Sequence, residues 1–175
     1  EKIENVVTKL KGSEKYTNQF IRAFGSAEVT ELTISLALEQ FMNSIVSYQS
    51  KYDEYLEGTV NLTTSEERGR KLFFQEYNQF IPDSSGADCA HCHSGFNFEN
   101  DRYMNNGLDA TFQDSGRAKA TKNGQDAGKF KVVSLRNIAL TAPYMHDGRF
   151  NSLMAVLDHY DSGLKNSSTL DPALE

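Results

Sequence analysis

Cysteine is scarce in this chain of 175 residues, which contains only Cys89 and Cys92. Two cysteines are too few for a disulfide framework, and a bridge between these neighbours would close so short a loop that it would add little stability. The sequence also lacks an apolar run approaching the roughly 20 residues that a membrane-spanning helix needs. It therefore excludes a disulfide-rich fold and a membrane span.

An excess of positive charge is missing as well. The formal net charge is −6, with acidic and basic residues interspersed, so the long-range field favours a small basic partner and gives nucleic acid no reason to bind. The opening stretch EKIENVVTKL resembles an amphipathic helix and has no basic region, apolar stretch and cleavage site in succession. If the protein is exported, its signal lies outside this sequence.

Apolar residues recur at helical spacing through most of the first 55 residues. One stripe consists of Ile3, Val6, Val7 and Leu10, and the next of Tyr16, Phe20 and Phe24, after which Gly25 is a natural stop. Thr30 is the expected N-cap of a longer helix that reaches Tyr48, and its apolar face is expected to pack in the core.

Two further helices flank a long polar region. Thr64 and Glu67 predict a capping box at the start of one helix, and Asn151 is the expected N-cap of the last. The segment 95–130 between them is rich in Gly, Asn, Asp, Ser and Thr, as expected for loops that surround a site or cover a cofactor. The predicted architecture is mostly α with large loops.

Both cysteines fall in the stretch CAHCHSG, and Cys-x-x-Cys-His is the attachment sequence of c-type haem. Two cysteines three residues apart share one face of a helical turn, so both can form thioethers to the haem vinyl groups. Cys89 and Cys92 are therefore the candidate thioether residues, and His93 is the candidate proximal ligand of the iron. Asp88 is the expected N-cap of the short helix that carries them.

Three other interpretations of the motif stay open at this point. A zinc site would need further ligands from His91, His146 and His159. A thioredoxin-like redox pair needs a strand-to-helix junction in a βαβ unit, which the sequence does not show. The remaining interpretation is a pair of buried cysteines without chemistry.

Together with the stretch GKFKVVSLRNIALTAPYMHDGRFNSLMAVLDHY, the motif makes the chain resemble the bacterial di-haem cytochrome c peroxidase family. That family includes the tyrosine-ligated enzyme that matures methylamine dehydrogenase. The resemblance runs from the first helix to about Gly163, and its most specific parts are CAHCHSGFNF and SLRNIALTAPYMHDGRF. It implies a cytochrome c-like helical domain with long loops around a haem (residues 63–175), preceded by a helical segment (residues 1–62).

This resemblance implies a periplasmic oxidoreductase with two haem domains, one reacting with hydrogen peroxide and the other transferring electrons. The chain has one haem motif where the family has two, so it is expected to be the C-terminal electron-transfer domain. Its residues 1–62 would belong to, or pack on, an N-terminal haem domain. The implied partners are that domain, hydrogen peroxide, a small electron-donor protein or organic substrate, and a second copy in a homodimer. The alternative function is a single-haem c-type cytochrome that only carries electrons.

Carried over residue by residue, the resemblance assigns further site residues. His146, in YMHDG, matches a histidine beside the haem and is the candidate catalytic residue. Arg136, in SLRN, is expected to pair with a haem propionate, because its guanidinium binds carboxylates in a fork. Thr141 and Pro143 match positions whose oxygens help to bind calcium between the two haem domains.

The sixth iron ligand is where the chain departs from the peroxidases. They place a methionine fourteen residues after the histidine of HDG, and the same count from His146 arrives at Tyr160. Tyrosine also ligates in the methylamine dehydrogenase maturation enzyme. A phenolate favours ferric and higher oxidation states, whereas a thioether favours ferrous iron. The other candidates for this ligand are Met104, Met145, Met154 and His159.

Overall fold

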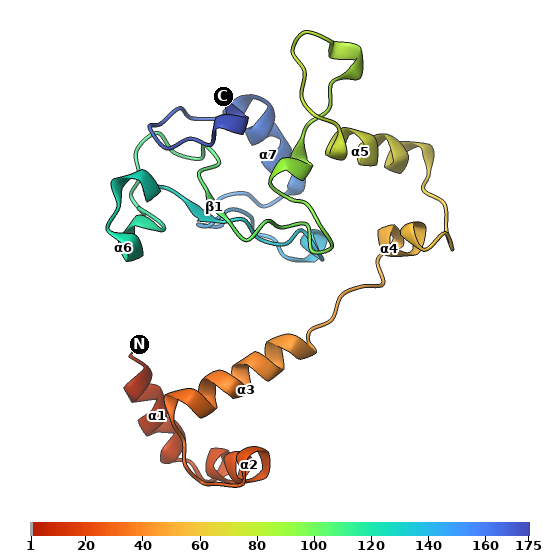
Figure 1. The fold of residues 1–175 in the computed structure, drawn as a ribbon. Helices are drawn as coiled ribbons and strands as arrows, with labels where there is room; N and C mark the ends of the chain where they lie inside the picture. Colours follow the sequence, from red (N-terminus) through yellow and green to blue (C-terminus); the bar gives the residue numbers. More distant parts are fainter. Residues whose placement is uncertain (1) are drawn as a thin grey trace. The chain divides into compact units, whose positions relative to one another are not determined.

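The computed structural model describes residues 2–175. The chain forms two compact units, which cover residues 1–48 and 49–175, and each is described by itself. Figure 1 shows helices joined by long irregular segments, and the only two strands among the described residues pair with each other. The mostly α prediction is confirmed. Every helix in this part of the chain is too short or too polar to cross a bilayer.

The first unit consists of α1 (Ile3–Lys11), α2 (Glu14–Phe24) and α3 (Glu31–Ser44). Gly25 ends α2 with a left-handed φ of 72°, as predicted. Thr30 caps α3 as predicted, because its side chain accepts a hydrogen bond from the backbone N–H of Thr33. A small core closes this unit around Phe20, Val29 and Ile34, with apolar residues of α1 packed against it.

The predicted burial of the apolar face of α3 is wrong for most of its residues. The helix ends at Ser44, short of Tyr48. Ile34 is buried, but Leu32 and Phe41 keep 67% and 63% of their surface exposed. Two short helices cannot cover all sides of a third, so within this unit the core takes one stripe of α3 and leaves the remaining apolar side chains in contact with solvent.

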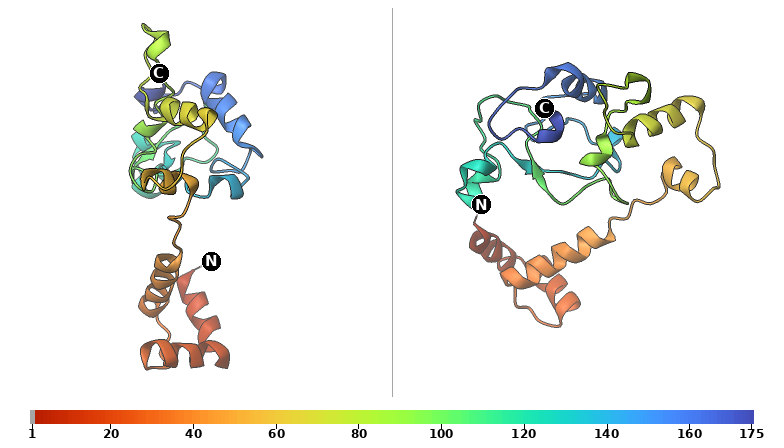
Figure 2. Two further views of the ribbon diagram at one scale, coloured as in Figure 1. Left: turned by 90° about the vertical axis from the view of Figure 1, so that its right-hand side faces the viewer. Right: turned by 45° about the horizontal axis from the view of Figure 1, so that its top comes forward.

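The second unit carries α4 (Lys51–Leu56), α5 (Thr64–Phe74), α6 (Ala118–Thr121) and α7 (Leu153–Asp158). β1 (Tyr103–Met104) pairs antiparallel with β2 (Phe130–Lys131), so that Met104 lies opposite Phe130. Figure 2 shows these elements embedded in long loops. The unit also contains six short helical turns: η1 (Pro82–Ser84), η2 (Cys89–His91), η3 (Gly124–Asp126), η4 (Ile138–Leu140), the π-helical turn η5 (His159–Gly163) and η6 (Pro172–Leu174). The predicted domain boundary between residues 62 and 63 stays a prediction.

Two predicted helix caps are wrong by one residue. Thr63 caps α5 in place of Thr64, and Glu66 completes the box by accepting a hydrogen bond from the backbone N–H of Thr63 at 2.7 Å. Consecutive threonines, each followed three residues later by a glutamate, satisfy the same pattern, so the sequence does not separate them. Ser152 caps α7 in place of Asn151 by accepting from the backbone N–H of Ala155.

A buried ion pair ties α4 to the loops of the second unit. Both terminal nitrogens of Arg136 donate to the two carboxylate oxygens of Asp53 at 3.0 Å. The side chains are only 11% and 9% exposed. Arg136 holds the pKa of Asp53 well below its usual range, with help from Ser50. The guanidinium also donates to the backbone carbonyl of Phe96, which joins α4 to the segment that follows the haem motif.

We predict that Asp53→Asn lowers the free energy of unfolding by about 2 to 3 kcal/mol, because it removes charge-assisted hydrogen bonds and leaves Arg136 buried without its counter-ion. Asp101→Asn is the matched control, since Asp101 pairs with Lys131 at 3.1 Å but its side chain is 85% exposed. This surface change should alter stability much less. Urea unfolding measures both, and equal effects would contradict the prediction.

The loss of stability caused by Asp53→Asn should depend on pH. The pKa of Asp53 is lowered on folding, so its contribution to stability is present above the unfolded value of about 3.9 and is lost as the pH falls through the folded pKa. The stability gap between the natural chain and Asp53→Asn should therefore narrow below about pH 4. Unfolding curves from pH 7 to pH 2 measure this, and a gap that widens on acidification would refute it.

Candidate haem site

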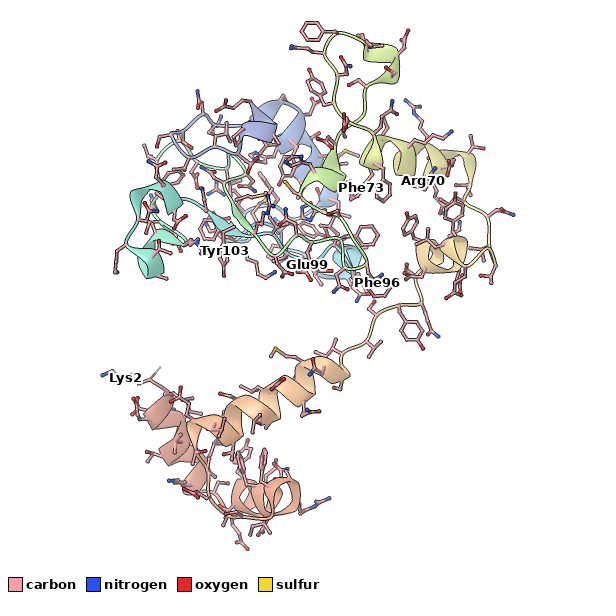
Figure 3. All side chains as sticks on the ribbon, viewed as in Figure 1. Lys2, Arg70, Phe73, Phe96, Glu99 and Tyr103 are labelled. Carbon is pink, nitrogen blue, oxygen red and sulfur yellow. The ribbon has the colours of Figure 1, made fainter. Side chains whose placement is uncertain are left out.

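The Cys-x-x-Cys-His motif begins on a single tight turn, η2 (Cys89–His91). The backbone N–H of His93 donates to the carbonyl of Cys89 at 2.9 Å, so the first cysteine and the histidine are held one turn apart. The C-terminal part of α5 supports the turn, because the backbone N–H of Ala87 donates to the carbonyl of Leu72 at 2.8 Å. Figure 3 labels Phe73 beside this turn. α5 therefore positions the motif.

Asp88 does not act as the predicted N-cap of this turn. Its backbone adopts a left-handed φ of 47°, and its side chain makes no capping hydrogen bond. An N-cap needs extended backbone to aim its side chain at the next N–H groups, and the left-handed conformation prevents that. The Asp88 carboxylate instead lies 3.8 Å from the exposed ring of His91.

His93 is oriented by a backbone carbonyl. Its Nδ1 lies 3.0 Å from the carbonyl oxygen of Phe98, a residue with a left-handed φ of 53°. A carbonyl can only accept, so Nδ1 carries the proton and Nε2 of the neutral ring keeps its lone pair. Burial lowers the pKa of His93 against the opposing effect of the Phe98 and Val133 carbonyls, which favours this neutral form. The ring is prepared to act as a ligand through Nε2.

The two cysteines are free thiols and are half-buried. Burial raises the pKa of Cys92 to about 11, with smaller contributions from the negative charges of Asp171 and Asp88. Burial also raises the pKa of Cys89. The Cys92 Sγ donates to the Met104 Sδ at 3.4 Å, so a thioether from β1 lines the same region. At neutral pH both thiols are protonated and share a weakly polar surrounding.

Tyr160 approaches this region from the π-helical turn η5, a type of distortion that occurs often at functional sites. The residue keeps 37% of its surface exposed, but protein atoms surround its hydroxyl, and this burial raises the pKa of the phenol. The Asn106 side-chain nitrogen donates to it at 3.5 Å.

The other candidates for the sixth ligand occupy different surroundings. Met145 has a left-handed φ of 72°, and its sulfur accepts from the Asn106 side chain at 3.3 Å. Met154 is 65% exposed on α7. His159 is only 6% exposed, and its Nε2 lies 3.0 Å from the carbonyl of Asn106, so that nitrogen is already used. Met104 therefore contacts the motif directly, whereas Met145 and Tyr160 share a contact with the Asn106 side chain.

The remaining predicted site residues are placed as follows. Both terminal nitrogens of the Arg136 guanidinium, which was predicted to pair with a haem propionate, donate to the Asp53 carboxylate. His146 is exposed and stacks on Phe130, with ring centroids 3.7 Å apart. The Thr141 hydroxyl donates to the carbonyl of Ile138 at 3.3 Å, and Pro143 follows a cis peptide bond.

The zinc interpretation finds no ligand cluster in the described part of the chain, since no group of three or more His, Cys, Asp or Glu residues there could hold a metal ion. The histidines it would require have other contacts: His91 faces Asp88, His146 stacks on Phe130, and His159 bonds the Asn106 carbonyl.

The residues fit a covalently bound haem. Two thiols three positions apart and an imidazole, with a phenol and thioethers as further candidates, are groups that can attach a haem or bind its iron. Among residues 49–175, Leu108 and Val132 are the only buried apolar side chains, and many others are half-buried. Protein interiors are close-packed, so this composition suits a domain whose core is completed by a large apolar group.

The sequence analysis did not identify Asn105 and Asn106, whose side chains contact residues far away in the sequence, including the candidate ligands Met145 and Tyr160. Asn105 is 2% exposed, and its side chain joins Ser167, Thr169 and the backbone of Gly107. In the sequence, Asn-Asn-Gly indicates only a turn. Partners 39 to 64 residues away leave no local pattern, so no sequence signal could have found this role.

Comparison with known proteins identifies relatives of the kind that the Cys-x-x-Cys-His motif predicts. A family model described as di-haem cytochrome c peroxidase matches residues 1–61. The cytochrome c551 peroxidase of Nitrosomonas europaea is 36% identical over 138 residues, which are 77% of this chain and 38% of that protein. The methylamine utilization protein MauG of Methylorubrum extorquens is 36% identical over 162 residues, which are 90% of this chain and 43% of that protein.

A solved structure shares the fold as well. The crystal structure of a MauG-like protein associated with microbial copper homeostasis aligns with a TM-score of 0.77 and 30% identity, over 98% of this chain and 55% of that one. The chain thus spans about half the length of these relatives or less. On the family model, the two relatives and the shared fold, the chain belongs to the di-haem cytochrome c peroxidase family, which includes MauG.

Proposed function

We propose that this chain binds one c-type haem through Cys89, Cys92 and His93, and acts as the C-terminal electron-transfer domain of a di-haem peroxidase-like oxidoreductase. One observation carries the proposal: the turn of the motif holds Cys89 and His93 one helical turn apart, and the Phe98 carbonyl orients the His93 ring as a ligand. The bound haem supplies a redox-active iron. The protein residues attach it, orient its ligands and limit the access of water.

The family supports peroxide as the oxidant. The name of the relative cytochrome c551 peroxidase supports peroxide reduction, with electrons that come either from a small donor protein or from an organic substrate. Reduction of hydrogen peroxide to water consumes two electrons and two protons. We assign the electron transfer to this domain, and the peroxide-reactive haem to an N-terminal haem domain.

Two features support placing residues 1–62 on that N-terminal haem domain. The family model matches residues 1–61, which ends close to the predicted boundary. The exposed apolar side chains of α3 are suited to packing against further protein, because an amphipathic helix gains stability by burying that face. A periplasmic location, a homodimer, and calcium held by oxygens of Thr141 and Pro143 are proposed on the resemblance.

The second candidate is a single-haem cytochrome that only carries electrons. Within these residues the one Cys-x-x-Cys-His motif can hold one haem, and that haem would be sufficient for electron transfer. It requires two strong axial ligands and a reversible one-electron couple, with no turnover of peroxide by the complete natural protein.

Haem attachment is the first test. We predict that Cys89→Ser with Cys92→Ser abolishes covalent haem, because no thioether can form. His91→Ala is the matched control, since His91 lies inside the motif but is exposed and needed for no bond to haem. Both variants, expressed with haem-attachment machinery, are compared by haem staining on denaturing gels and by metal analysis. Zinc in place of iron in the natural chain would overturn the proposed function.

The sixth ligand is tested by spectroscopy. The ferric haem-loaded chain should lack the weak far-red band from sulfur to iron and should resist reduction, because a phenolate stabilises ferric iron. Tyr160→Met should gain the band and be reduced more readily. Tyr103→Phe is the control, because Tyr103 contacts Arg117 and lies outside the ligand candidates. A sulfur band in the natural chain would refute Tyr160 ligation.

Peroxide turnover separates the two functions. We predict that the haem-loaded chain alone oxidises a dye no faster than free haem. If His93 and Tyr160 both bind the iron, no position is left for peroxide. The acid-base residue that would assist O–O cleavage is assigned to the other haem domain. The complete natural protein should turn over peroxide. Efficient turnover by this chain alone would refute the assignment of peroxide chemistry to another domain, and none by the complete protein would favour the electron carrier.

A further inference from the structure

We infer that Asn106 is a positioning residue that selects Tyr160 over Met145 as the sixth ligand at the haem site. The inference rests on the proposed function, since it concerns the ligands of the haem that Cys89, Cys92 and His93 would hold. The inference is based on the Asn106 side-chain amide, which lies between the two candidate ligands, Met145 and Tyr160.

The Asn106 amide nitrogen contacts both candidates. It lies 3.3 Å from the Met145 sulfur and 3.5 Å from the Tyr160 hydroxyl oxygen. An amide NH2 group carries two hydrogens, so it can donate to both acceptors at once. Met145 and Tyr160 are fifteen residues apart in the sequence and come from different elements, and within the second unit Asn106 is the side chain that bridges them.

The Asn106 backbone is held by the same turn that carries Tyr160. The Asn106 carbonyl lies 3.0 Å from Nε2 of His159, a side chain only 6% exposed. Because the carbonyl accepts, Nε2 carries the proton. His159 precedes Tyr160 in the π-helical turn η5, so this hydrogen bond fixes the distance between the Asn106 main chain and the tyrosine.

The residues on either side of Asn106 are also anchored. The buried Asn105 side chain donates to Ser167 at 2.9 Å and to Thr169 at 3.0 Å. The Gly107 carbonyl accepts from the backbone N–H of Lys165 at 2.7 Å. Gly107 has a left-handed φ of 68°, and a Cβ there would meet Leu164 and Leu170 at 3.1 Å. Asn106 therefore sits in a loop that cannot easily shift.

Arg149 ties the turn that carries Met145 to this loop. It donates to both carboxylate oxygens of Asp109 at 2.9 Å and to the carbonyl of Leu108 at 3.3 Å. It also binds Asp147, two residues after Met145. The methionine, the tyrosine and the amide between them are thus held by three separate sets of polar contacts.

This geometry favours the Tyr160 oxygen over the Met145 sulfur as the iron ligand for two reasons. A hydrogen bond to the Met145 sulfur occupies one of its lone pairs and directs the thioether toward Asn106, which weakens it as a competitor for iron. A hydrogen bond to the Tyr160 oxygen stabilises negative charge on that atom, and a hard anionic ligand benefits from such a donor. Both contacts act through the N–H groups of one amide.

The test compares Asn106→Ala and Asn106→Asp with the natural haem-loaded chain. Aspartate keeps the shape of the side chain but cannot donate when ionised. Both variants should gain the far-red sulfur band in the ferric spectrum, and their midpoint potentials should shift to more positive values. Adding Met145→Leu to Asn106→Ala should remove the band, because Met145 is the sulfur that replaces Tyr160.

Asn100→Ala is the matched control. Asn100 is a half-buried asparagine whose amide approaches another thioether, the Met104 sulfur, at 3.7 Å. This variant should leave the spectrum and the potential unchanged. Urea unfolding of all variants shows whether any change in the spectrum comes only from loss of folding.

The outcomes separate this inference from the proposed function. Covalent haem in every variant, with identical spectra and potentials, would overturn the role of Asn106 and leave the proposed function standing. A lower stability of Asn106→Ala without a change in ligand would show that Asn106 is merely structural, which also overturns the inference. Absence of covalent haem from the natural chain would overturn both.

Discussion

The buried ion pair between Asp53 and Arg136 is the interaction on which the second unit depends. It links α4, near the start of the unit, to a loop more than 80 residues further along the chain, and the same guanidinium holds the Phe96 carbonyl. Phe96 follows His93 closely, and Phe98 binds the His93 ring. An uncompensated charge at this position would be costly, so the pair forces α4, the 136 loop and the histidine segment into one arrangement.

Polar contacts of this kind take over much of the task that an apolar core performs elsewhere. The second unit buries only two apolar side chains, whereas it buries Asp53, Asn105, His159 and Thr169, and no fully buried side-chain nitrogen or oxygen among the described residues lacks a hydrogen-bond partner. Hydrogen bonds are directional, so they set the orientation of His93 and Tyr160 in a way that loose apolar packing cannot. A haem bound through His93 would need such a fixed orientation of its ligand.

Parts of the fold could be predicted because their causes are local. The stop at Gly25 and the cap at Thr30 depend on backbone conformation and on side chains within one turn. The cap at Thr63 was missed because Thr64 satisfies the same pattern. The core role expected for the apolar stripe of α3 failed for a different reason: a stripe predicts that a helix has an apolar face, but only the neighbouring elements determine how much of that face is covered.

At the site, the sequence by itself determined which groups are offered to a haem: two thiols and an imidazole at the spacing of a haem attachment motif. The tertiary structure decided which groups surround them. In the folded chain Arg136 forms an ion pair with Asp53, and the His159 ring contacts the Asn106 carbonyl. The Asn106 amide lies between Met145 and Tyr160. The physical reason is that covalent spacing sets which donors one turn can present, whereas hydrogen bonds between residues 40 to 80 positions apart exist only once the chain has closed its loops.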